Sequence, residues 1–116
     1  MERIVSRIIE SVFVTFEAEN SSYFESCFVC FGDLAIKISV DELFDELIIK
    51  EYQEETLPSK SVIPIWADKL VGRTINRYWN CQNDMGYFDL LILSTDQLFP
   101  TVCIYGVASQ LDVKFI

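Results

Sequence analysis

A Gly-Asp pair at positions 32 and 33 separates two stretches in which apolar residues alternate with other types. Glycine accepts the positive φ angle that opens a tight two-residue turn, so residues 23–31 and 34–40 are predicted to form a β-hairpin. Side chains two apart share a face of a strand. One face is therefore predicted to be apolar, with Cys27, Val29, Phe31, Leu34, Ile36 and Ile38. The other, more polar face is expected to meet water or a second layer and carries Ser26, Phe28, Cys30, Lys37 and Ser39.

Further segments have the β-branched and aromatic composition of strands, namely 11–17, 73–82, 87–94, 101–106 and 111–115. Asn83 and Gly86 supply turn chemistry between the second and third of these, which predicts another hairpin. Pro64 suits the first turn of a short helix that would end at Gly72. The first ten residues fit a helix and a strand equally well.

The stretch 41–55 has two interpretations. Val40, Leu43, Phe44, Leu47 and Ile48 recur at helical spacing, and Ser39 with Glu42 matches a capping box, which favours a helix. Alternatively, residues 47–49 form a short strand after a turn at Asp45, because so short a pattern does not decide between the two periods.

The predicted elements define the fold class. A chain of 116 residues with 51% hydrophobic content has the size and the apolar side chains of one domain, spanning residues 1–116. The prediction is an α+β, β-dominated domain. It comprises a single antiparallel sheet of about six to eight strands, curled or closed into a small barrel, with one or two short helices against it.

Charge limits the classes of partner. Nine Lys and Arg residues stand against eighteen Asp and Glu, a net charge of −9, which repels a nucleic-acid backbone. No stretch resembles a signal peptide or approaches the roughly 18 apolar residues of a membrane span. We therefore expect a cytoplasmic protein that binds neither nucleic acid nor membrane.

Two observations argue against catalysis and cofactors. The chain has no histidine, which removes the commonest general base and the commonest metal ligand. Cys27 and Cys30 have CxxC spacing, but residues three apart in a strand point to opposite faces, and Cys81 and Cys103 are isolated. We expect four free thiols, no metal, no cofactor and no catalytic residue.

An acidic cluster is the candidate surface for a partner. Seven carboxylates lie between positions 41 and 55, opposed there only by Lys50: Asp41, Glu42, Asp45, Glu46, Glu51, Glu54 and Glu55. They are either the solvated face of an amphipathic segment or a negative patch that docks a basic protein.

The C-terminal half resembles a family of short bacterial proteins described only as a domain of unknown function. A Leu-x-Gly element precedes a strand with a Trp, and Asn-x-x-Gly-Tyr-x-Asp follows; the matching residues are Leu70, Gly72, Trp79, Asn83, Gly86, Tyr87, Asp89, Ala108 and Ser109. The resemblance spans about residues 66–116. It implies a β-rich fold and no activity.

The same motif offers a second candidate site. Tyr87 and Asp89 share a face of their strand, and Asn83 can bond to its own turn. Structural support of the turn is one interpretation, and a ligand pocket bounded by Trp79, Tyr87 and Asp89 is the other. The functional expectation is a non-enzymatic module for a basic protein, such as an immunity-like or antitoxin-like protein or a small regulatory subunit. The alternatives are a small-molecule or catalytic pocket around these three residues, and a homo-oligomer that pairs exposed strand edges.

Overall fold

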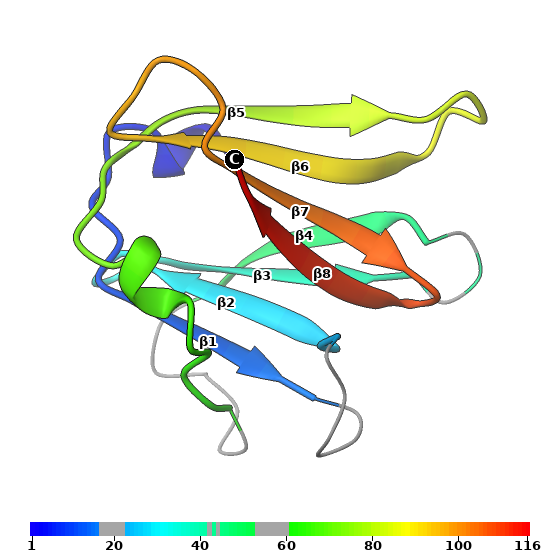
Figure 1. The fold of residues 1–116 in the computed structure, drawn as a ribbon, viewed down its shortest axis with the longest axis horizontal. Helices are drawn as coiled ribbons and strands as arrows, with labels where there is room; N and C mark the ends of the chain where they lie inside the picture. Colours follow the sequence, from blue (N-terminus) through cyan, green and yellow to red (C-terminus); the bar gives the residue numbers. More distant parts are fainter. Residues whose placement is uncertain (17–22, 42, 44, 53–60) are drawn as a thin grey trace.

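The computed structural model describes residues 1–16, 23–41, 43, 45–52 and 61–116. The strands form two four-stranded antiparallel sheets, and strands consecutive in the chain are neighbours in each sheet (Figure 1). The first sheet contains β1 (Ser11–Thr15), β2 (Ser26–Cys30), β3 (Ala35–Val40) and β4 (Leu47–Tyr52). The second contains β5 (Ile75–Gln82), β6 (Phe88–Thr95), β7 (Val102–Val107) and β8 (Gln110–Phe115).

The hairpin at Gly32-Asp33 has the predicted register. Cys27 lies opposite Ile38 and Val29 opposite Ile36, and the amide of Phe31 donates to the carbonyl of Leu34 at 2.7 Å. Gly32 has a φ of 93°, which is the left-handed conformation that made glycine the expected residue. The second predicted hairpin is also confirmed, since β5 and β6 pair and Asn83 to Tyr87 close the turn.

The second face of the first hairpin, expected to meet water or a second layer, is removed from water along β2. Ser26, Phe28 and Cys30 are all buried, like the rest of this strand. β2 is an interior strand, and Phe28 lies between Phe13 and Lys37 in the ladder, with the Lys37 ammonium 5.9 Å from its ring centroid. Neighbouring side chains on both sides remove these groups from water.

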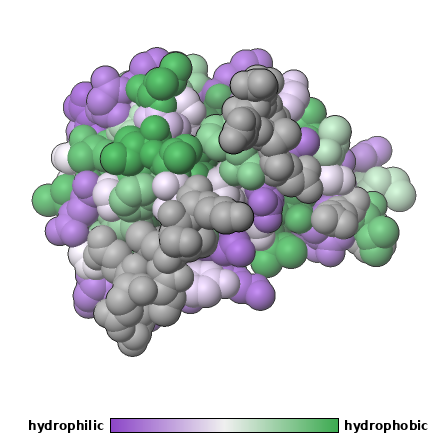
Figure 2. Space-filling view, turned by 90° about the horizontal axis from the view of Figure 1, so that it is seen from below, coloured by the Kyte–Doolittle hydropathy of each residue, from purple (hydrophilic) through white to green (hydrophobic). Residues whose placement is uncertain are grey.

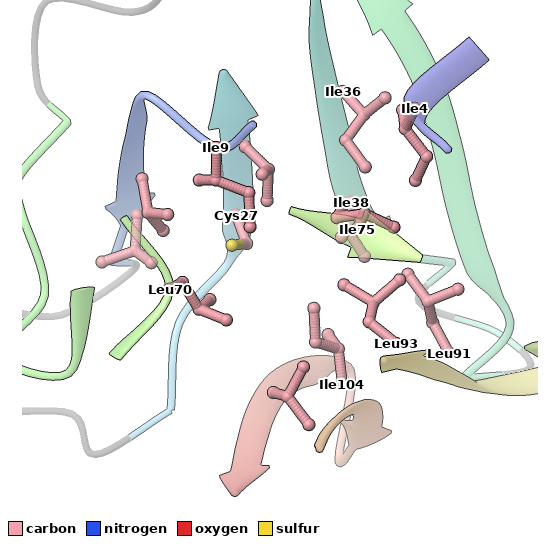
Figure 3. Packing of buried hydrophobic residues seen from close by; sticks show 14 of the residues in the cluster. Ile4, Ile9, Cys27, Ile36, Ile38, Leu70, Ile75, Leu91, Leu93 and Ile104 are labelled. Carbon is pink, nitrogen blue, oxygen red and sulfur yellow. The ribbon is translucent and has the colours of Figure 1, made fainter. Parts of the chain in front are cut away.

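The hydrophobic core lies between the two sheets (Figure 3). Ile36 and Ile38 of β3 point towards Ile75, Leu93 and their neighbours in the second sheet. Two isolated bridges also join the sheets, one between Ile8 and Thr74 and one between Phe24 and Leu111. These contacts make the two layers one packed unit.

The single curled sheet or small barrel is therefore wrong, although the β-dominated antiparallel fold is confirmed. Both sheets are open, and the chain leaves the first after β4 and begins the second at β5. Alternation specifies one buried face for each strand, but it does not say which strands share a ladder.

The expected α-helices are also wrong within the described residues, where the helical elements are two 3-10 turns, η1 (Glu2–Ile4) and η3 (Ala67–Lys69). The helix predicted from Pro64 to Val71 is reduced to η3. No helix in the described part of the chain has the length and apolar content to cross a membrane.

The structure decides between the two interpretations of residues 41–55 in favour of the strand. β4 follows a turn at Asp45, which has a φ of 53°, and the Asp41 amide donates to the Glu46 carbonyl at 2.8 Å. Leu47 lies opposite Val40 and is buried in the core. The strand is favoured over the helix because it adds backbone hydrogen bonds at the edge of the sheet, while its alternate residues still reach the core.

Candidate functional site

The acidic connection between β3 and β4 is tied to the second sheet. An Asp45 carboxylate oxygen accepts a hydrogen bond from the Ser109 amide at 2.6 Å, in the β7–β8 turn. A Glu46 carboxylate oxygen accepts one from the Phe88 amide at 3.2 Å, at the start of β6. Asp41 accepts the Leu43 amide at 2.8 Å within its own turn. The Asp45 and Glu46 carboxylates therefore fasten the two sheets together at one end.

Glu51 makes ion pairs with the N-terminal segment. Its carboxylate pairs with the Arg3 guanidinium at 2.9 Å and with the amino group of Met1 at 3.6 Å. The remaining candidates, Glu42, Glu54 and Glu55, lie outside the described residues. Each described member of the acidic cluster thus accepts a contact from within the molecule, which the sequence pattern did not reveal.

The β7–β8 turn that Asp45 holds has an unusual backbone. Val107 pairs with Gln110, so Ala108 and Ser109 form a two-residue turn, and both have positive φ angles, 50° and 67°. Turns of this type normally contain Asn and Gly, because a Cβ is disfavoured there. Gly106 approaches the same site, since a Cβ on it would lie 2.8 Å from the Asp45 carbonyl oxygen.

Trp79 lies in β5, Asp89 in β6 and Tyr87 immediately before β6. Trp79 is directly opposite Ile92, whereas Asp89 falls at a register shift of the ladder, between the pairs Cys81–Leu90 and Gln82–Phe88. A ligand pocket bounded by Trp79, Tyr87 and Asp89 stays a prediction.

Asn83 and Asp89 contribute to the turn between β5 and β6. The Asn83 side-chain oxygen accepts the amides of Met85 at 2.9 Å and Tyr87 at 3.1 Å. Its side-chain nitrogen donates to Asp89 at 3.3 Å. These hydrogen bonds fit the structural interpretation of the motif, in which Asn83 supports its own turn.

The cysteines are free thiols, as predicted. Cys27 and Cys30 lie on the single strand β2, with Cys27 in the core and Cys30 on the other face. Burial, with a smaller effect from Cys30, raises the pKa of the Cys27 thiol to about 12. A thiol with so high a pKa is a poor nucleophile at neutral pH.

An apolar groove of about 380 Å³ lies beside β1. The groove is defined here by the residues that line it, Val14, Phe16, Phe24, Val62, Ile63, Pro64, Ile65 and Trp66. Val14 and Val62 exchange backbone hydrogen bonds at 2.8 and 2.9 Å, which attach the 61–66 segment to the edge of the first sheet. The lining residues that the structure describes are aliphatic or aromatic, and they supply no acid, base or nucleophile.

An aromatic cluster supports the groove. The Trp66 ring lies 5.9 Å from the Phe24 ring and 5.8 Å from the Phe115 ring, and the Lys69 ammonium lies 4.9 Å from the Phe115 ring centroid. Ile63 and Ile65 are nevertheless 70% and 98% exposed. Figure 2 views the molecule from the side of β1 and of residues 61–66 and shows apolar side chains gathered on this surface.

Sequence reasoning missed the groove. Its one local signal is the apolar run Val62-Ile63-Pro64-Ile65-Trp66, in which the sequence predicts the first turn of a helix at Pro64. Val14, Phe16 and Phe24 join it only through the tertiary structure.

The chain belongs to the family of unknown function DUF6334, whose model matches residues 1–116. The match extends the resemblance noted for the C-terminal half to the whole chain. Comparisons with curated proteins and with solved structures gave no match.

Proposed function

We propose that this chain is a non-enzymatic module that binds a basic protein partner, and that the groove beside β1 receives an apolar side chain of that partner. The observation that carries the proposal is that the described lining residues of the groove are apolar and that two of them, Ile63 and Ile65, are largely exposed. Concave apolar sites flanked by polar surface are typical of places where a partner inserts an anchor residue.

The charge of the chain supports a basic partner. The net charge of −9 attracts a positively charged protein from a distance and speeds its encounter. Glu25 and Asp68 are exposed close in sequence to the groove residues Phe24 and Trp66. The carboxylates at 41–51 contribute to this field, although their hydrogen bonds and ion pairs are made within the molecule.

A pull-down from native lysate tests the proposal with matched variants. Ile63→Ser with Ile65→Ser removes the two most exposed apolar side chains of the groove, whereas Leu98→Ser with Phe99→Ser removes comparably exposed groups, 72% and 60%, from the β6–β7 loop. The wild-type chain is expected to recover a basic protein in stoichiometric amount. The groove variant should weaken recovery at least about tenfold and the loop variant should not, because loss of an anchor costs more than about 1.4 kcal/mol.

Salt provides an independent criterion. Raising ionic strength to about 0.5 M shortens the screening length and should slow capture of a basic partner. Failure to recover a stoichiometric basic protein at low salt, or equal losses in the groove and loop variants, would contradict the proposal.

A further inference from the structure

The outward side of the second sheet carries an apolar surface that is separate from the groove. Strand register places Trp79, Ile92 and Cys103 in one row across β5, β6 and β7, and Cys81, Leu90 and Tyr105 in the next row. We call these six residues the outer face of the second sheet. All six are partly exposed, whereas the outward residues of β2 in the first sheet are buried.

β8 adds one charged residue to each row, and the two charges have opposite signs. Lys114 lies beside Cys103 and continues the first row, and Asp112 lies beside Tyr105 and continues the second. Arg77, opposite Ser94 near the start of β5, is a further charge on this side of the sheet. Within the described residues neither Lys114 nor Arg77 has an ion pair.

These charges indicate which kind of molecule could bind to the outer face of the second sheet. A basic partner gains little here, because the cations Lys114 and Arg77 offset Asp112 on this face, in a chain whose total charge is −9. Two copies of so acidic a chain repel each other over most of their surfaces, so self-association requires a face that is apolar and locally balanced. The outer face of the second sheet meets both requirements.

We propose that two copies of this chain associate through the outer faces of their second sheets, about a two-fold axis that lies between the two rows. In a two-fold interface, when residue i contacts residue j, j also contacts i. The first row of one copy then lies on the second row of the other. Ile92 packs on Leu90 of the second copy, Trp79 on Cys81 and Cys103 on Tyr105.

The same operation brings the charges together. Lys114 of each copy faces Asp112 of the other, so the interface contains two identical ion pairs at its β8 ends. Asp112 already accepts the Tyr105 hydroxyl at 2.9 Å, which fixes the carboxylate on this surface before the copies meet.

Light scattering after size-exclusion chromatography, from about 1 µM to about 500 µM, tests the proposal, since dimerisation follows mass action. The mass should rise from 13.4 kDa towards twice that value. Lys114→Asp places like charges opposite each other and should raise the dissociation constant at least about tenfold. The swap that combines Lys114→Asp with Asp112→Lys should restore dimerisation, and Lys50→Asp, an equally exposed strand lysine of the first sheet, should leave it unchanged.

The native cysteines provide a second measurement without substitution. Alkylation of Cys81 and Cys103 at about pH 8, mapped by mass spectrometry, should slow as concentration rises, while the buried Cys27 and Cys30 stay unreactive throughout. The proposal is overturned by a monomeric mass at all concentrations, or by a dimer in which Lys114→Asp has no effect and the two thiols stay equally reactive. The latter result would point to pairing of strand edges.

Discussion

Replacement of Gly106 by alanine isolates the close approach between the two sheets. Gly106 lies in β7 and does not have a positive φ, so alanine suits its backbone conformation. The added Cβ would nevertheless lie 2.8 Å from the Asp45 carbonyl oxygen, closer than real Cβ contacts. Because the obstructing atom belongs to the backbone, relief requires the β3–β4 connection to move away from β7.

The expected cost follows from overpacking, which typically destabilises a protein by about 1–3 kcal/mol. A loss of about 2 kcal/mol in a chain of 116 residues corresponds to a fall in Tm of about 8 °C. Urea unfolding followed by tryptophan fluorescence measures the free energy, and hydrogen exchange reports the local effect. Exchange of the Ser109 amide should accelerate, since displacement of Asp45 weakens the 2.6 Å hydrogen bond that protects it.

Gly72→Ala provides the contrast. Gly72 has a φ of 85° and open space around its Cβ position, so alanine there costs about 1 kcal/mol of backbone strain without moving Asp45. A Gly106→Ala protein with stability within about 0.5 kcal/mol of wild type and unchanged exchange at Ser109 would refute the reasoning.

Two other predictions concern backbone strain and pH. Ala108→Asn with Ser109→Gly places the preferred residues at the two positive φ angles and should raise the free energy of unfolding by about 1–2 kcal/mol in urea titrations. Ala108→Ser should not, because it leaves the Cβ of Ser109 in place and puts neither Asn nor Gly at position 108; equal effects would contradict the strain. The Thr74 amide and the Arg73 guanidinium lower the pKa of Asp96, so its stabilising contribution is present above the unfolded-state pKa of about 3.9 and is lost as pH falls through the lower folded value. Asp96→Asn should therefore lose less urea stability than wild type between about pH 5 and pH 2, and parallel curves would rule out this linkage.

In the two candidate sites predicted from the sequence, the contacts of the described residues are mainly structural ones made within the chain. Asp45 and Glu46 stand out as charge in the sequence, but their hydrogen bonds run to Ser109 and Phe88, which are distant in the chain. A charge pattern in the sequence shows how polar a segment is, but it does not show which backbone amides will donate hydrogen bonds to its carboxylates. The groove, by contrast, combines Val14 with Val62 and the residues that follow it, and no local pattern joins segments so far apart.

Local chemistry in the sequence determined the strands, the Gly32-Asp33 and Asn83–Gly86 turns, and the separation of Cys27 from Cys30, because alternation and turn geometry act over a few residues. Only the tertiary structure decided that the strands form two sheets and that residues 47–52 extend the first of them. Those outcomes depend on which apolar faces cover one another, and such burial is a property of contacts between distant segments.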